Sequence, residues 1–150
     1  MADTSAGGTL CVYGVPPTMA LRDGAGRSIG QTFTLTRTNQ ASFERALRIA
    51  LAAFVGADAD MMSARFVFVR DAAQIAAAIR SGRYTQVVYY GHADQYANAL
   101  IPAPGVRVTP AQLAAALRGT SVSHVDILGC RSTSFAAELS TSLQRYESGT

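Results

Sequence analysis

The chain has 150 residues, of which 49% are hydrophobic and 15% charged, and its formal net charge at pH 7 is +3. This length and balance suit one folded domain with its own core, and they exclude an extensively disordered chain. No apolar run approaches the roughly 20 residues that span a bilayer, so we expect no membrane partner.

The 13 basic residues are all Arg and are scattered from Arg22 to Arg145. A nucleic-acid-binding protein more often carries a basic stripe with aromatic residues among it, so we expect no nucleic-acid partner. Residues 1–8 contain no basic residue and no long apolar stretch, which is unlike a secretory signal. We expect residues 1–8 to be disordered and the chain to be cytoplasmic, unless a specialised secretion route exports it.

In the first half of the chain, a short apolar run at 9–13 is closed by Gly14 and a pair of prolines, and it predicts the first strand. The alternating pattern within 28–37 predicts a half-exposed strand or hairpin at an edge. Apolar residues at helical spacing predict a helix over 41–55 that ends at Gly56. The run at 65–69 predicts another strand.

In the second half, strands and helices alternate. Asp71 can cap a helix over 72–80. Thr109 followed by Pro110 and Gln112 is a typical helix start, and that helix should end at Gly119. The remaining predicted elements are a strand at 86–90, a small hairpin or folded loop within 94–108, a strand at 124–128 and a last helix from 132–134 to about 145. Apolar strands that alternate with helices predict a single α/β domain over 1–150, with a mainly parallel sheet flanked by helices on both faces.

His92 and Cys130 each come directly after one of these strands, and each follows a glycine. One helix separates the two strands, which predicts that they are parallel neighbours with their carboxyl ends at one edge. Open α/β sheets place their chemistry at that edge. The sequence therefore predicts a thiol nucleophile and its base, although a Cys at a strand end is more often a core residue and a His there is often only a loop residue.

Residues beside the pair can support this chemistry. Cys130 precedes a predicted helix start, where unpaired amides favour a thiolate, and Arg131 adds positive charge. The backbone around Gly129 and the N–H of Ala93 are candidates for binding an oxyanion. Asp94 and Asp126 are candidates for orienting the His.

Other chemistries are disfavoured. Only Cys11, Cys130, His92 and His124 offer sulfur or imidazole ligands, without CxxC or HxxxH spacing, so we expect no metal and no cofactor. Cys11 lies inside a predicted strand and His124 starts one, which indicates structural roles. A cysteine phosphatase would need Arg at position 136, where the chain has Ala, and no GxGxxG follows a strand.

Three segments, at 87–92, 105–113 and 125–130, resemble the caspase-like cysteine peptidases of clan CD, and most closely the bacterial CHAT domains and the self-processing protease domains of large toxins. The resemblance covers residues from about 65 to 143 and is weaker from 9. It implies that Cys130 is the nucleophile and His92 the base of a cysteine endopeptidase. Such an enzyme would cleave a protein substrate or its own precursor.

The chain also departs from that family. Ala93 replaces the usual Gly after the His, where its methyl group would crowd the oxyanion site, and the caspase signature is reduced to Cys130-Arg131. Family members continue beyond the helix that follows the Cys. The resemblance therefore implies a truncated domain, a large subunit alone or a short member, with a second chain or segment completing the sheet. These departures favour the alternative of a catalytically inactive, caspase-like interaction module.

Family peptidases often prefer a charged residue before the cleaved bond. Arg22, expected in the loop after the first strand, and Arg131 are candidates for contacting an acidic substrate side chain. A surface Arg without such a role is the commoner case.

Overall fold

A computed structural model describes residues 8–14, 18–22, 28–34, 38–52, 61, 63–94, 96–128 and 133–148. Within these ranges, the side chains of 18–22, 28–34, 133 and 144–148 are not described. Residues 1–7 of the segment expected to be disordered, the predicted helix end at Gly56, and the candidate residues Gly129, Cys130 and Arg131 lie outside the described part of the chain. Gly8, also expected to be disordered, is the first residue of a strand.

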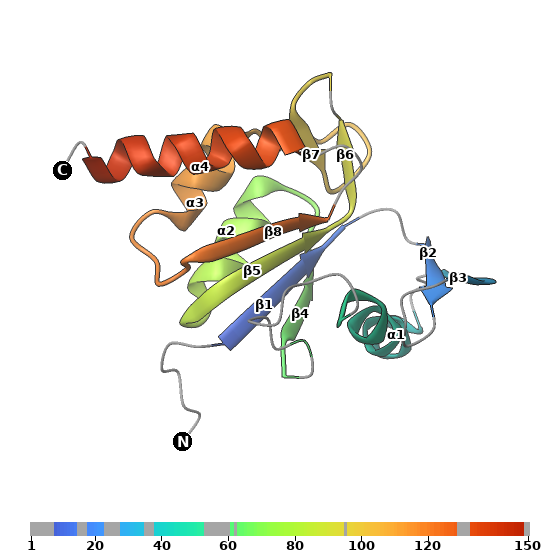
Figure 1. The fold of residues 1–150 in the computed structure, drawn as a ribbon. Helices are drawn as coiled ribbons and strands as arrows, with labels where there is room; N and C mark the ends of the chain where they lie inside the picture. Colours follow the sequence, from blue (N-terminus) through green and yellow to red (C-terminus); the bar gives the residue numbers. More distant parts are fainter. Residues whose placement is uncertain are drawn as a thin grey trace.

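A four-stranded parallel sheet forms the centre of the molecule, in the order β4-β1-β5-β8 (Figure 1). These strands are β1 (Gly8–Tyr13), β4 (Arg65–Phe68), β5 (Tyr84–Tyr90) and β8 (His124–Leu128). The predicted α/β class and mainly parallel sheet are confirmed. Consecutive strands need a crossover to run parallel, and the helices between them provide it.

Helices pack on both faces of this sheet. Helix α1 (Gln40–Ala52) lies on one face, and α2 (Ala72–Arg80), α3 (Pro110–Leu117) and α4 (Thr133–Ser148) lie on the other (Figure 1). The alternation of side chains along a strand divides the core accordingly. Leu10 and Val12 join the cluster under α2, α3 and α4, whereas Cys11 and Tyr13 join the cluster under α1.

The helix starts follow the sequence signals closely. Asp71 caps α2 by accepting a hydrogen bond of 2.8 Å from the Gln74 N–H. Thr109 and Gln112 form a capping box at the start of α3, with Pro110 in the first turn. Helix α4 reaches Ser148, three residues beyond the predicted end near 145.

Two antiparallel hairpins lie outside the central sheet. The first pairs β2 (Thr18–Arg22) with β3 (Ser28–Thr34). Of the two alternatives predicted within 28–37, the single strand is the one observed, and its partner β2 is a strand that the sequence did not predict. Arg22 is therefore the last residue of a strand and not a loop residue, because its position pairs with Ser28 across the hairpin. The second hairpin pairs β6 (His92–Asp94) with β7 (Ala99–Ile101), which resolves the predicted choice between a hairpin and a folded loop.

Gly14 shows why the chain needs a glycine just after β1. A Cβ atom at this position would lie 2.6 Å from the carbonyl oxygen of Pro102 and 2.7 Å from its Cα. The segment after β7 therefore packs directly on the backbone at the carboxyl end of β1. The Gly14 N–H also donates to the Tyr90 carbonyl at 3.0 Å, which continues the β1–β5 ladder to the edge of the sheet.

Candidate active site at the carboxyl edge of the sheet

The strands that precede His92 and Cys130 are neighbours, as predicted. Strands β5 and β8 run parallel with Tyr90 opposite Leu128, and the Gly91 N–H approaches the Leu128 carbonyl oxygen at 3.5 Å. His92 lies two residues beyond Tyr90, and position 130 is two residues beyond Leu128. The two strands therefore end at the same edge and at the same level, beside the β6–β7 hairpin (Figure 1).

His92 is exposed and begins β6, so it belongs to a short strand and not to a loop. Its carbonyl oxygen accepts a hydrogen bond of 3.0 Å from the hydroxyl group of Tyr89. The Tyr89 ring is buried in the core, and this burial raises the pKa of its phenol group. Tyr89 therefore connects the core to the backbone of His92, a role beyond the strand packing that the sequence indicated.

The hydrogen-bond ladder directs the Ala93 amide away from the hairpin. Ala93 pairs with Leu100, but Leu100 exchanges both of its backbone hydrogen bonds with Val108, at 2.9 and 2.8 Å. Both backbone groups of Leu100 therefore point away from Ala93, and the two residues form a non-hydrogen-bonded pair. Such pairs alternate with hydrogen-bonded pairs in an antiparallel ladder. The N–H of Ala93 therefore points away from β7. The methyl group of Ala93 packs against the core cluster beneath α3 and α4.

The two candidate carboxylates are engaged elsewhere. Asp94 accepts hydrogen bonds from the N–H groups of Tyr96 and Ala97, at 2.9 and 3.2 Å, and so stabilises the turn between β6 and β7. Asp126 accepts one from the side chain of Gln86 at 2.5 Å and lies 3.2 Å from His124 Nε2. Asp126 pairs with Val88, four residues before His92, or about 13 Å along the strand. The expectation that Asp126 could orient His92 is therefore wrong.

The cluster of Gln86, His124 and Asp126 is a feature that the sequence did not predict. Gln86 is 4% exposed and is one of the few buried polar residues among those described. Strand register explains the cluster. Gln86 lies opposite His124 on the neighbouring strand, and Asp126 is two residues beyond His124, so all three side chains lie on the same face of the sheet. His124 starts its strand, as predicted, and lies at the opposite end from the His92 edge.

Cys11 is fully buried in β1. Desolvation raises the pKa of its thiol group, and the nearby Glu44 carboxylate raises it further. A thiol in this setting stays protonated and unreactive at neutral pH. The prediction that Cys11 is a core residue is confirmed.

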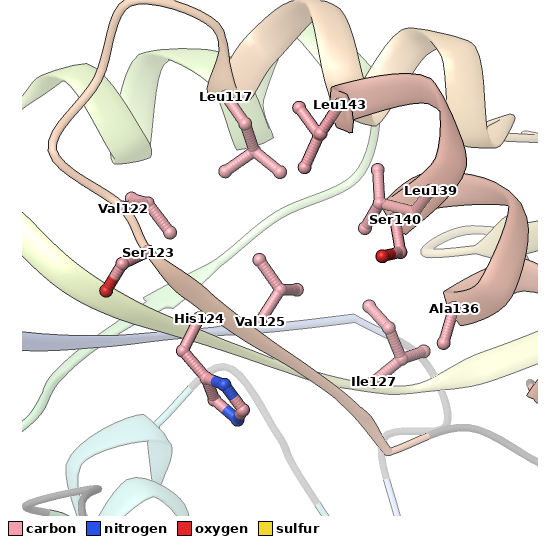
Figure 2. A pocket seen from close by; sticks show the side chains of 10 residues that line it. All are labelled: Leu117, Val122, Ser123, His124, Val125, Ile127, Ala136, Leu139, Ser140 and Leu143. Carbon is pink, nitrogen blue, oxygen red and sulfur yellow. The ribbon is translucent and has the colours of Figure 1, made fainter. Parts of the chain in front are cut away.

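A cavity of about 520 Å³ lies between β8 and helix α4, with the end of α3 above it (Figure 2). Val125 and Ile127 point into it from the strand, and Leu139 and Leu143 point into it from α4, whereas His124 points to the other side of the strand. Within the described ranges, no group of three or more His, Cys, Asp or Glu side chains could hold a metal ion. No helix in this part of the chain is both long and apolar enough to cross a membrane.

The fold defines an α/β protein with a parallel central sheet, and His92 lies at the carboxyl edge of that sheet. No protein-family model, no curated protein and no solved structure gives a significant match to the chain.

Proposed function

We propose that the chain is a caspase-like cysteine endopeptidase that uses Cys130 as nucleophile and His92 as general acid and base. The observation that carries this proposal is the register of β5 and β8, with Tyr90 opposite Leu128. Neighbouring strands lie about 4.8 Å apart and rise about 3.3 Å per residue. These spacings allow an imidazole and a thiol that each follow such a pair by two residues to reach each other.

In this mechanism His92 takes the proton of the Cys130 thiol, and the resulting thiolate attacks the scissile carbonyl carbon of a protein substrate or of the precursor of this chain. The resulting oxyanion accepts hydrogen bonds from backbone amides, for which the N–H groups of Ala93 and of the Gly129 region are the candidates. His92 then donates a proton to the leaving amine, which leaves an acyl-enzyme. Water, deprotonated by His92, hydrolyses this thioester and restores the thiol.

Two structural observations support these roles. The N–H of Ala93 is directed away from β7. The methyl group of Ala93 packs on the core, so this side chain, which replaces the glycine of the family, does not need to crowd the oxyanion. Both Asp94 and Asp126 are engaged with other partners. This engagement suits a Cys–His dyad better than a triad with a carboxylate.

The engagement of both carboxylates also suits the alternative function, a catalytically inactive caspase-like module that binds a partner protein. Arg22 at the end of β2 and Arg131 remain candidates for contacting an acidic substrate or partner. In this alternative, changing Cys130 to Ala leaves biological activity intact, whereas surface substitutions abolish it.

The test is covalent labelling of the full chain with peptide acyloxymethyl ketones, read by mass spectrometry of tryptic peptides. We expect Cys130 to be labelled and Cys11 to remain unlabelled. His92→Ala should slow labelling about 100-fold, because it removes the general base. His124→Ala, at the opposite end of the sheet, is the matched control and should label at the wild-type rate. Equal labelling of both cysteines, or no labelling of Cys130, would refute the proposal that the chain is a cysteine peptidase.

A further inference from the structure

The β6–β7 hairpin stands at the carboxyl edge of the central sheet and leaves one side of β6 open (Figure 1). Its two strands form a separate sheet, and among the described residues no strand lies along the outer side of β6. Leu100 turns both of its backbone groups to Val108, so it forms a non-hydrogen-bonded pair with Ala93. The N–H and the C=O of Ala93 therefore both point to the open side of β6.

Two contacts show which way this open side faces. The Gly91 N–H points to β8, since it approaches the Leu128 carbonyl oxygen at 3.5 Å. Alternate residues of an extended strand direct their backbone groups to the same side, so the groups of Ala93 also point to the β8 side. Strand β7 lies on the other side, because Pro102, which follows it, packs on Gly14 at the end of β1. The open side of β6 therefore faces the strand that leads to the proposed nucleophile.

The hairpin that carries this open side is held at several points. Leu100 exchanges backbone hydrogen bonds of 2.9 and 2.8 Å with Val108, and the Asp94 carboxylate accepts two more within the turn. The side chain of Asn98 donates to Glu138 of α4 at 3.2 Å. A strand edge that is already ordered binds an extended peptide without a further cost of ordering on its own side.

We propose that an extended segment of the substrate pairs antiparallel with β6, with its P1 residue, the residue before the scissile bond, opposite Ala93. This inference rests on the proposed peptidase function and names the substrate conformation that the site accepts. The P1 N–H donates to the Ala93 C=O, and the Ala93 N–H donates to the P1 carbonyl oxygen. One backbone edge then both aligns the substrate and stabilises the oxyanion that forms on that oxygen.

The position of His92 selects this direction and register. His92 and Asp94 pair with β7 on either side of Ala93 and turn their backbone groups toward it, so within β6 only Ala93 offers both groups outward. Only an antiparallel pair lets one substrate residue take both hydrogen bonds. It also places P1′, whose nitrogen is the leaving group, opposite His92, the residue that protonates this nitrogen. A parallel substrate would instead place P1′ on the side of Asp94.

The test compares peptide acyloxymethyl ketones that differ only in the position of one N-methyl group. Methylation of the P1 nitrogen removes the donor to the Ala93 C=O and should slow the labelling of Cys130 about tenfold. Methylation of the P2 nitrogen is the matched control. In this register the P2 N–H points away from β6, so this probe should label Cys130 at a rate close to that of the unmethylated probe.

Amide hydrogen exchange gives a second readout. Exchange of the Ala93 N–H should slow once Cys130 carries the unmethylated probe, whereas exchange of the Ala73 N–H, in the first turn of α2, should not change. Equal effects of the two methyl groups, or unchanged exchange at Ala93 in the labelled chain, would overturn the pairing and leave Cys130 as an active nucleophile. No labelling of Cys130 by any probe would refute the peptidase and the pairing with it, so the two failures are distinguishable.

Discussion

At the scale of single residues, the two cysteines differ by their position along a strand. Cys11 lies in the middle of β1, where burial and Glu44 raise the pKa of its thiol. Cys130 follows the end of β8, at an edge where His92 is exposed. The same side chain is therefore expected to be inert in one place and nucleophilic in the other, because thiolate formation depends on access to solvent and positive charge.

Tyr89 provides a residue-scale prediction. Tyr89→Phe removes the hydroxyl group that donates to the His92 carbonyl at 3.0 Å and keeps the buried ring. We expect a loss of about 1 kcal/mol in the free energy of unfolding, measured by urea denaturation. If Tyr89 positions His92, Cys130 labelling should also slow. Tyr96→Phe is the control, since Tyr96 is 91% exposed. Unchanged labelling in Tyr89→Phe would limit Tyr89 to a packing role.

At the scale of secondary-structure elements, local sequence signals and observed boundaries agree best where a cap is present. The Asp71 and Thr109 caps place the starts of α2 and α3 where the sequence predicts them. Helix α1 is held by distant contacts as well. The Arg48 guanidinium donates to the carbonyl oxygens of Met61 and Ala64, at 2.8 and 2.9 Å, and lies over the Phe66 ring. These contacts attach α1 to the segment that leads into β4.

The caps give an element-scale prediction. Asp71→Ala and Thr109→Ala each remove a side-chain acceptor from a helix start, and each should lower the free energy of unfolding by about 1 kcal/mol in urea titrations. Asp71→Asn and Thr109→Ser keep an acceptor and should stay close to wild type. Similar losses in the Ala and the conservative variants would argue against capping as the cause.

At the scale of the whole molecule, one strand joins two cores. Strand β1 contributes Leu10 and Val12 to the cluster under α2, α3 and α4, and Cys11 and Tyr13 to the cluster under α1. The Tyr13 hydroxyl group also donates to Glu44 of α1 at 2.6 Å. The two clusters, one on each face of the sheet, therefore share the backbone of β1, and loss of one cluster should destabilise the other.

This arrangement predicts a single cooperative unfolding transition. Leu47→Ala on the α1 face and Leu113→Ala on the α3 face should each cost about 2–5 kcal/mol and shift the whole transition. Ile49→Ala is the control, because Ile49 is 57% exposed on the same helix as Leu47. Circular dichroism and tyrosine fluorescence should report the same midpoint. Two separate transitions in Leu47→Ala would show that the cores unfold independently.

The sequence by itself determined much of the element pattern. Hydrophobic periodicity and capping residues predicted the central strands, the start of α3 and both ends of α2, because these signals act over a few residues. The strand–helix–strand order also predicted that β5 and β8 are parallel neighbours, since such crossovers have few topological solutions.

Only the tertiary structure decided the register and the partners across it. The pairing of Gln86 with His124 and the contact of Gln86 with Asp126 depend on which residues of distant segments lie side by side. The hydrogen bond from Tyr89 to His92 depends on the turn that the chain makes between β5 and β6. Strand β2 and the position of Arg22 within it also depend on pairing with β3. These contacts join residues far apart along the chain or across a turn, and a one-residue change of register would move every side chain to the opposite face.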